Sequence, residues 1–400
     1  MIFKLKGTYQ HYDWGGESFI PNWLKLKEVE EKPYAEYWLG AHRSSPSSIE
    51  FEGQWLELDR VLDKAPKLLG EKSREQFGDE LPFLLKILDV KKPLSIQLHP
   101  TIAEARAGYE REEQLGIPLS APNRTYKDRN HKPEMMIALS DFWLLHGFRT
   151  ESKMFDALNQ HDSLKPIAEA IEQRSLASVY ADIMQADQAQ LAEWLLPVIH
   201  AKREEYQQDK LKLDNPDYWV LYTMEAMGIR EDKLDAGLLC FYLFNIVNVK
   251  KGEGIYQSAG LPHAYLRGQN IELMAASDNV IRGGLTSKYV DIPALLNTID
   301  YREITPKIIP AYEGDEPLYL YPTPEAEDFA MQRFEFKPFD EEQFLATSAS
   351  ILLVMTGSLY IDLGEDSIHL QQGEAAFISA DARVDVIGEV DGYAIIVTLP

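Results

Sequence analysis

The spacing of hydrophobic residues changes twice along this 400-residue chain. In residues 1–150, short apolar runs such as 83–90 alternate with stretches rich in proline, glycine and serine, a pattern typical of strands joined by loops. In residues 151–235 glycine becomes scarce and apolar residues recur at helical spacing, as Ile167 does with Ile171. We therefore predict a mainly β fold with an α-helical insertion at residues 151–235.

The strand pattern returns after the insertion and continues to the end of the chain. Residues 305–330 are rich in proline and lead into 348–400, where alternation and repeated turns indicate antiparallel strands. We predict a first β domain, an inserted helical domain and a smaller last β domain, at residues 1–150 with 236–310, at 151–235, and at 311–400.

A short spacing recurs in the two β regions. The stretches 252–263 and 373–384 share a Gly-Glu pair followed by a serine, but Val384 in the second stands where the first has His263. Two β-barrels of one design, of which only the first binds a metal, are the simplest interpretation. A chance match is the alternative.

Net charge and cysteine content limit what the chain can bind and where it works. The formal net charge is −24, which argues against general binding to nucleic acid or to anionic lipid. The single cysteine, Cys240, allows no intrachain disulfide, and no apolar run is long enough to span a membrane. Because residues 1–6 lack the apolar stretch of a secretory signal, we expect a cytoplasmic protein. An anionic substrate would need a local basic cluster.

Four residues could surround one divalent metal ion. Gln97 and His99 are two apart, so on a strand their side chains point to the same face. Glu134 and His263 could complete the set, since imidazole and carboxylate are usual zinc ligands. Glutamine is an uncommon zinc ligand, and a histidine such as His99 can instead be a hydrogen-bonded structural residue. The residues alone leave both interpretations open.

Other candidates for chemistry lie near these ligands in the sequence. Lys132 is two residues before Glu134 and faces the same pocket if both lie on a strand; a solvated lysine is the alternative. Arg282 could clamp an oxyanion with its planar donors, or pair with Asp278. Trp14, in an aromatic turn, could form a wall for a sugar or pack into the core.

Several motifs, taken together and in this order, resemble those of type I mannose-6-phosphate isomerases, the phosphomannose isomerases. They are YAEYWLGAH (34–42), SIQLHP (95–100), NHKPE (130–134), PHAY (262–265), AASDNVIR (275–282) and GLT (284–286). The match is colinear over residues 1–300, whereas residues 311–400 fit only by pattern. Tyr37 and Arg43 depart from the residues common in that family, which bears little on the chemistry.

The resemblance implies a fold of two cupin-type jelly rolls with an inserted helical domain. It also implies a zinc-dependent interconversion of mannose 6-phosphate and fructose 6-phosphate through a cis-enediolate, with one zinc ion per chain. The implied zinc ligands are Gln97, His99, Glu134 and His263. We expect a monomer whose partner is a small sugar phosphate, and neither nucleic acid nor a membrane.

Within such a mechanism, Arg282 would stabilise the developing oxyanion, because its guanidinium offers fixed donors. The candidates for proton transfer and ring opening are Lys132, Asp278, the rival base Glu272, and His131. The candidates for binding the phosphate or the sugar are Ser95, Lys86, Lys132, Lys288 and Trp14. Lys132 cannot comfortably be both phosphate anchor and base, and the sequence does not decide between these roles.

Two other functions stay open on the sequence alone. A different metal-dependent cupin enzyme, such as an oxygenase, would favour two histidines and a carboxylate with open positions. A non-catalytic sugar-phosphate sensor would keep the pocket without the reaction. The extra candidate ligand Gln97 argues against the first function, and the presence of Arg282 and Lys132 argues against the second.

Overall fold

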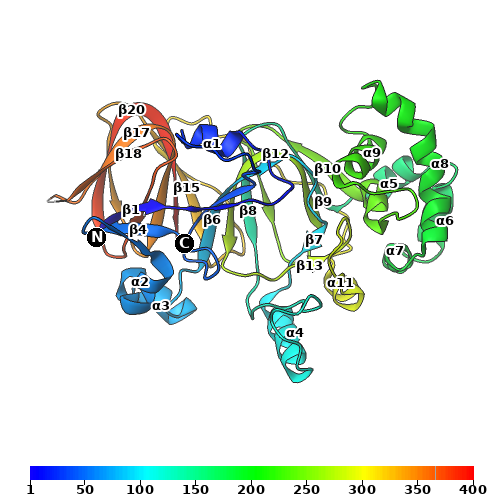
Figure 1. Cartoon of the computed structure of the whole chain (residues 1–400), viewed down its shortest axis with the longest axis horizontal. Helices are drawn as coiled ribbons and strands as arrows, with labels where there is room; N and C mark the ends of the chain where they lie inside the picture. Colours follow the sequence, from blue (N-terminus) through cyan, green and yellow to red (C-terminus); the bar gives the residue numbers. More distant parts are fainter. Residues whose placement is uncertain (365) are drawn as a thin grey trace.

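Two antiparallel sheets form the body of the molecule, and helices extend from one end and from the lower side (Figure 1). This computed structural model describes residues 1–364 and 366–400. Each sheet has ten strands among these residues. No helix in the described ranges combines the length and the apolarity needed to span a bilayer. The predicted fold class, mainly β with an α-helical insertion, is confirmed.

The first sheet, called the site sheet below, carries the candidate metal ligands. Its strands are β2 (Thr8–Gln10), β3 (Glu36–Leu39), β6 (Phe83–Val90), β7 (Gln97–Leu98), β8 (Glu134–Ala138), β9 (Phe142–Phe148), β10 (Phe244–Val249), β11 (Gly254–Gln257), β12 (His263–Ala275) and β13 (Ile281–Arg282). The main path runs β10-β9-β12-β6-β3-β2, with the other strands paired beside it. Because β6 is buried along its whole length, its charged residues Lys86 and Asp89 are enclosed.

The second sheet joins the two ends of the chain. Its strands are β1 (Ile2–Lys6), β4 (Ser48–Phe51), β5 (Gln54–Glu57), β14 (Leu318–Leu320), β15 (Ala330–Phe336), β16 (Glu341–Leu345), β17 (Ser350–Asp362), β18 (Ser367–Gln371), β19 (Ala375–Ile378) and β20 (Arg383–Thr398). β1 pairs with both β19 and β4, so early residues are hydrogen-bonded to strands of residues 311–400. The predicted domain division stays a prediction. Strands β1, β4 and β5 lie within residues 1–150 but belong to the second sheet, whose other strands lie within 311–400.

The helical insertion interrupts two neighbouring strands. β9 and β10 are antiparallel partners, with Phe148 opposite Phe244, and the inserted helices lie between them in sequence at the right of Figure 1. They are α5 (Glu151–Leu158), α6 (Lys165–Gln173), α7 (Leu176–Met184), α8 (Gln188–Gln207) and α9 (Pro216–Met227). Their apolar faces share one buried cluster that includes Leu195 and Trp219. After the insertion come the short helices η2 (Ala236–Leu239) and α10 (Cys240–Leu243), and β structure returns only at Phe244. The sequence does not locate this boundary, because an unbroken apolar run shows no period that distinguishes helix from strand.

The remaining helices connect or flank the strands of the two sheets. They are α1 (Phe19–Trp23), α2 (Leu58–Lys64), η1 (Pro66–Leu69), α3 (Glu71–Phe77), α4 (Ile102–Gln114) and α11 (Ile292–Thr298). α4 projects from the lower side in Figure 1 and begins at a capping box. In that box the Thr101 hydroxyl accepts from the Glu104 N–H, and the Glu104 carboxylate accepts from Thr101.

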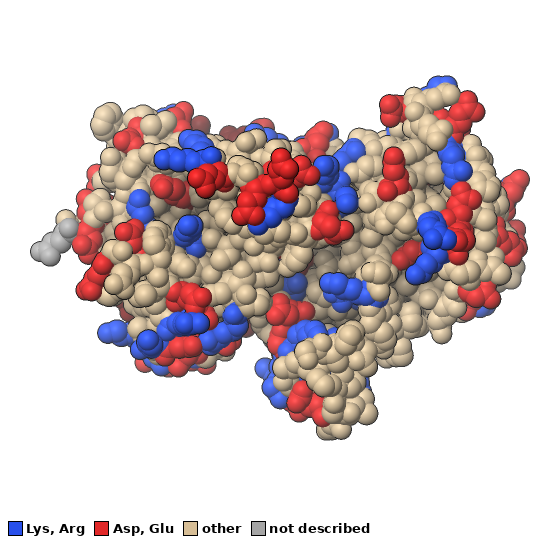
Figure 2. Space-filling model, in the orientation of Figure 1, with Lys and Arg blue, Asp and Glu red and all other residues tan. Residues whose placement is uncertain are grey.

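Acidic and basic side chains are interspersed over the face shown in Figure 2. With a net charge of −24, this face presents no broad basic area of the kind that holds a phosphate backbone. A small anionic ligand would therefore have to find its cations inside a local site.

Candidate metal centre and active site

Three of the four predicted metal ligands meet inside the site sheet. Glu134 is the first residue of β8, His263 is the first residue of β12, and His99 directly follows β7. One ligand atom from each of the three lies within 4.8 Å of the others. The Glu134 carboxylate places Oε1 3.2 Å from His99 Nε2 and Oε2 3.2 Å from His263 Nε2. All three side chains are buried, so this group could bind a metal ion.

The hydrogen bonds around the imidazoles show that a cation fits here. His99 Nδ1 donates to the Asn279 carbonyl at 2.7 Å, and His263 Nδ1 donates to the Leu261 carbonyl at 2.9 Å. In a neutral ring each Nε2 is then an acceptor, and it faces a carboxylate that can only accept. Burial lowers the pKa of His99 to about 4, which favours the neutral ring. The buried Nε2 atoms of both rings and Glu134 Oε2 have no hydrogen-bond partner within the described residues, and a divalent metal would satisfy all three.

Gln97 lies beside this group through strand register. It is opposite His263 on β12 and opposite Arg282 on β13, and its half-buried side chain lines the same cavity as Glu134. Directly opposed residues on antiparallel strands have neighbouring side chains. The structure thus places Gln97 between the metal group and the candidate oxyanion clamp, while its role as a fourth ligand stays a prediction.

A cavity of about 320 Å³ opens above the metal group. It is lined by nearly all the remaining predicted residues, namely Trp14, Lys86, Lys132, Glu272, Asp278, Arg282 and Lys288. His99 and His263 lie beneath the cavity wall and are not among its lining residues. Segments far apart in the chain therefore build one site with a metal group at its floor and cations on its walls.

Lys86 is held inside the cavity by two carboxylates. Its Nζ lies 3.3 Å from Glu272 and 3.7 Å from Glu36, and 5.0 Å above the Trp38 ring. Burial alone would lower the pKa of Lys86, but Glu36, Glu272 and Glu134 outweigh that effect and raise the pKa. The ammonium group is therefore charged and already paired, which limits what it can offer to a phosphate.

Glu272 is a buried carboxylate with an altered acidity. Burial raises its pKa, and the nearby Glu134 carboxylate adds to the effect, while Lys86 opposes it. The Tyr265 hydroxyl donates to Glu272 Oε1 at 2.8 Å. A carboxylate with a raised pKa is a reasonable proton acceptor, so the geometry keeps Glu272 among the candidates.

Lys132 and Arg282 are two further cations of the cavity lining. Lys132 is 8% exposed and its Nζ lies 3.7 Å from Glu134 Oε1. The half-buried Arg282 guanidinium has no hydrogen bond or ion pair to any described residue. Burial lowers the pKa of Arg282, so this cation sits partly desolvated with free donors. The alternative pairing with Asp278 is not found among the described residues.

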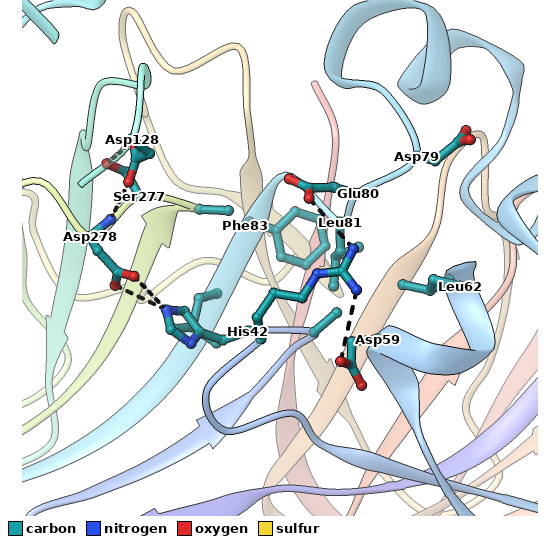
Figure 3. Close-up of a pocket in the computed structure, with 14 residues that line it drawn as sticks. His42, Asp59, Leu62, Asp79, Glu80, Leu81, Phe83, Asp128, Ser277 and Asp278 are labelled. Atoms are coloured by element: carbon teal, nitrogen blue, oxygen red, sulfur yellow. Dashed lines mark hydrogen bonds and ion pairs between the residues drawn. The ribbon is translucent and has the colours of Figure 1, made fainter. Parts of the chain in front are cut away.

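Asp278 pairs with a histidine instead. His42 Nε2 lies 2.9 and 3.1 Å from the two Asp278 carboxylate oxygens, as Figure 3 shows. The Asp278 backbone N–H donates to Asp128 at 2.7 Å. Asp278 lines both the 320 Å³ cavity and a neighbouring cavity of about 230 Å³. It lies at the rim of the candidate site, more than half exposed.

Two predicted residues lie outside the cavity lining. Ser95 is half-buried and does not line it. His131 directs its Nε2 to the buried carboxylate of Asp328, 2.5 Å away. Lys132 and Glu134 line the cavity, whereas the neighbouring His131 does not and contacts Asp328 instead. The roles predicted for His131 and Ser95 stay predictions.

Among the cavity-lining residues that sequence reasoning missed are Glu36, Trp38 and Tyr265. Glu36 and Trp38 are two apart on β3, and Trp38 is opposite Lys86, which is opposite Glu272 in turn. Tyr265 reaches Glu272 from the same strand. The two-residue spacing of Glu36 and Trp38 was a usable signal for a shared face. Their pairing with Lys86 depends on register between distant strands, which no local pattern reveals.

A mainly β fold with a buried His–Glu–His group beneath a cation-lined cavity defines a metal-dependent site for a small anionic molecule. Residues 2–151 match the family model "Phosphomannose isomerase type I, catalytic domain". Mannose-6-phosphate isomerase from Escherichia coli K12 is 33% identical over 390 residues, covering 94% of this chain and 95% of the relative. A solved structure of mannose 6-phosphate isomerase from Salmonella typhimurium, bound to its substrate and to zinc, matches with a TM-score of 0.87, 30% identity, and coverage of 100% of this chain and 99% of that chain. A zinc-bound structure of mannose 6-phosphate isomerase matches with a TM-score of 0.87, 31% identity and the same coverage. The chain belongs to the type I mannose-6-phosphate isomerase family.

Proposed function

We propose that this chain is a zinc-dependent aldose–ketose isomerase that interconverts mannose 6-phosphate and fructose 6-phosphate. Family membership and the relatives bound to substrate and to zinc support the proposal. The observation that carries it is the orphaned His99–Glu134–His263 acceptor group directly below a cavity that holds free and buried cations. The proposed reaction moves a proton between C1 and C2 of the open-chain sugar through a cis-enediolate.

A coupled assay with mannose 6-phosphate tests the proposal directly. We expect turnover by the protein as purified, one zinc per chain by metal analysis, loss of turnover on chelation and its return with added zinc. The absence of mannose 6-phosphate turnover in zinc-loaded protein would refute the proposal.

Charge develops on the substrate oxygens as the C–H bond breaks, and the site must stabilise it. A zinc ion held by His99, Glu134 and His263 would supply positive charge that stabilises a developing oxyanion. The Arg282 guanidinium, which has no partner among the described residues, can donate to the developing enediolate from a partly desolvated position. Because Arg282 is opposite Gln97 in the sheet, its backbone is fixed relative to the metal group.

Two side chains can move the proton. Lys132 reaches the cavity beside Glu134, and Glu272 lies on the same wall with a raised pKa. Lys132 has the fewer competing partners, since Glu272 is held by both Lys86 and Tyr265. We favour Lys132 as the proton carrier, with Glu272 and the rim residue Asp278 as its rivals. Solvent deuterium exchange into product, measured in K132M and E272Q variants, distinguishes the first two.

The phosphate requires a cation that is not already neutralised. Lys288 is exposed, lines the cavity, and has no side-chain partner among the described residues, whereas Lys86 is paired with two carboxylates. We therefore place the phosphate near Lys288. Trp14 is half-buried in the lining and stacks on Tyr12 with ring centroids 5.8 Å apart, which provides an aromatic wall for the sugar.

Each alternative function predicts a different assay result. An oxygenase would consume oxygen, whereas the proposed isomerase turns over equally with and without it. A sugar-phosphate sensor would bind without turnover, which leaves the buried Lys132 and the unpaired Arg282 without a role.

The remaining assignments belong to the same proposal. We propose a first jelly-roll domain at residues 1–150 with 236–310, a helical insertion at 151–235 and a second jelly-roll domain at 311–400. Strands β1, β4 and β5 of the first range complete the second sheet. We propose a monomer, because one chain supplies every residue of the metal group and the cavity; light scattering tests it. We propose a cytoplasmic location, in keeping with one buried, unpaired cysteine.

A further inference from the structure

The carboxylate of Asp328 is buried where it meets the segment that precedes β8. Asp328 is 1% exposed and lies two residues before β15, in the part of the chain that belongs to the second sheet. Its one hydrogen bond or ion pair within the described residues joins its Oδ2 to His131 Nε2, at 2.5 Å. Burying a carboxylate is costly unless it is paired, so this contact is what makes the position tolerable.

From this contact we infer that Asp328 and His131 form a positioning pair that fixes the direction of Lys132 in the cavity. The inference rests on the proposed isomerase function. His131 and Lys132 are consecutive in the segment that leads into β8, and their side chains go different ways: His131 contacts Asp328, whereas Lys132 lines the cavity. One side is held by Asp328, and the other carries the Lys132 ammonium group into the cavity.

Both ends of this contact are held rigidly. Phe329, the residue after Asp328, is fully buried in a core cluster that also contains Met135 of β8. On the other side, the Asn130 carbonyl accepts from Asn279 Nδ2 at 2.8 Å. A rigid support of this kind matters because Lys132 must meet the substrate within a fraction of an ångström, and a misplacement of about 1 Å can cost roughly a hundredfold in rate.

This role differs from the ring-opening role predicted for His131. A ring-opening acid–base must exchange a proton with the sugar, whereas a positioning residue only needs to donate a hydrogen bond to Asp328. A glutamine amide reaches about as far as the imidazole Nε2 and can also donate, but it cannot titrate. The H131Q variant therefore separates the two roles.

The test compares mannose 6-phosphate turnover, zinc content and thermal unfolding in H131Q, H131L, D328L and the double variant. We expect H131L and D328L each to lower kcat about 10- to 100-fold with one zinc per chain. H131Q should stay within about threefold of the parent, and D328L/H131L should be no slower than H131L alone. The matched control is D217L, because Asp217 is another buried carboxylate paired with a histidine, His161, at 2.8 Å within the helical insertion. D217L should lower stability and leave kcat unchanged.

Several results would overturn the inference. These are an H131Q variant as slow as H131L, a D328L variant with parental kcat, losses that multiply in the double variant, or a D217L variant that loses as much kcat as D328L. If D328L does not fold, the comparison of H131Q with H131L decides alone. An inactive parent protein would refute the proposed function instead, so the two failures are distinguishable.

Discussion

Removal of the metal should destabilise the protein. The E134Q variant should be more stable than the parent protein without metal and less stable than the parent with zinc. Without a cation, His99 Nε2, His263 Nε2 and Glu134 Oε2 are buried acceptors with no partner in the described structure. Each such atom costs about 1–3 kcal/mol. The metal-free protein should therefore be less stable than the zinc-bound one by roughly 3–9 kcal/mol.

The E134Q variant replaces one of these acceptors by a donor. The new amide N–H would lie where a carboxylate oxygen is now 3.2 Å from an imidazole Nε2, and it can donate to that atom. Metal-free E134Q should thus be more stable than the metal-free parent by about 1–3 kcal/mol. With zinc the order reverses, because an amide oxygen is a weaker ligand than a carboxylate.

Urea unfolding at pH 8, with zinc or with a chelator, measures these differences. At that pH His99 is neutral, since its pKa is lowered to about 4. The control is E112Q, because Glu112 is a buried carboxylate already paired with Arg124 at 3.0 Å. It should be destabilised equally with and without zinc. A metal-free E134Q protein that is less stable than the metal-free parent would refute the reasoning from unpaired acceptors.

Three further substitutions separate the parts of the molecule. R282A should lower kcat about 10²- to 10³-fold while zinc stays at one per chain, because only an oxyanion donor is lost; near-parental turnover would remove Arg282 from the mechanism. K288A should raise KM for mannose 6-phosphate more than it lowers kcat, since an exposed cation lost from the cavity weakens phosphate binding; an unchanged KM would mean that the phosphate lies elsewhere. L195A removes a fully buried side chain from the insertion core and should cost about 2–5 kcal/mol of unfolding free energy with unchanged kcat; a loss of kcat in the folded variant would show that the insertion takes part in catalysis.

Local spacing was enough to predict the outline of this site. The insertion was visible as a change from strand-like to helical spacing, and helices α5 to α9 lie within residues 151–235. Lys132 was expected to share a face with Glu134 because they are two apart, and both line the cavity. The same alternation predicts that His131, one residue before Lys132, points to the opposite side. There its imidazole pairs with the Asp328 carboxylate.

Register between distant strands was beyond local patterns. Lys86 was predicted as a candidate for binding the phosphate, but its pairing with Glu36 and Glu272 depends on how β3 and β12 align on β6. A shift of one residue in either alignment would send those carboxylates to the other face. The resemblance to a known family supplied what spacing could not, namely which distant segments meet.

One long strand explains why the groups converge. β12 has 13 residues and carries His263 at its start and Glu272 near its end, an odd separation that strict alternation would place on opposite faces. Its pairing with β9 shifts between Tyr265 and Arg267, where β12 contains one extra residue, and Gly268 has a φ of +127°. Such a bulge changes the phase of alternation by one. Glu272 therefore lies on the same face as Tyr265, and its carboxylate accepts a hydrogen bond from the Tyr265 hydroxyl at 2.8 Å. Because β12 pairs with β6, β7, β8 and β9, this single irregularity aligns the candidate metal group with the cavity wall that carries Glu272.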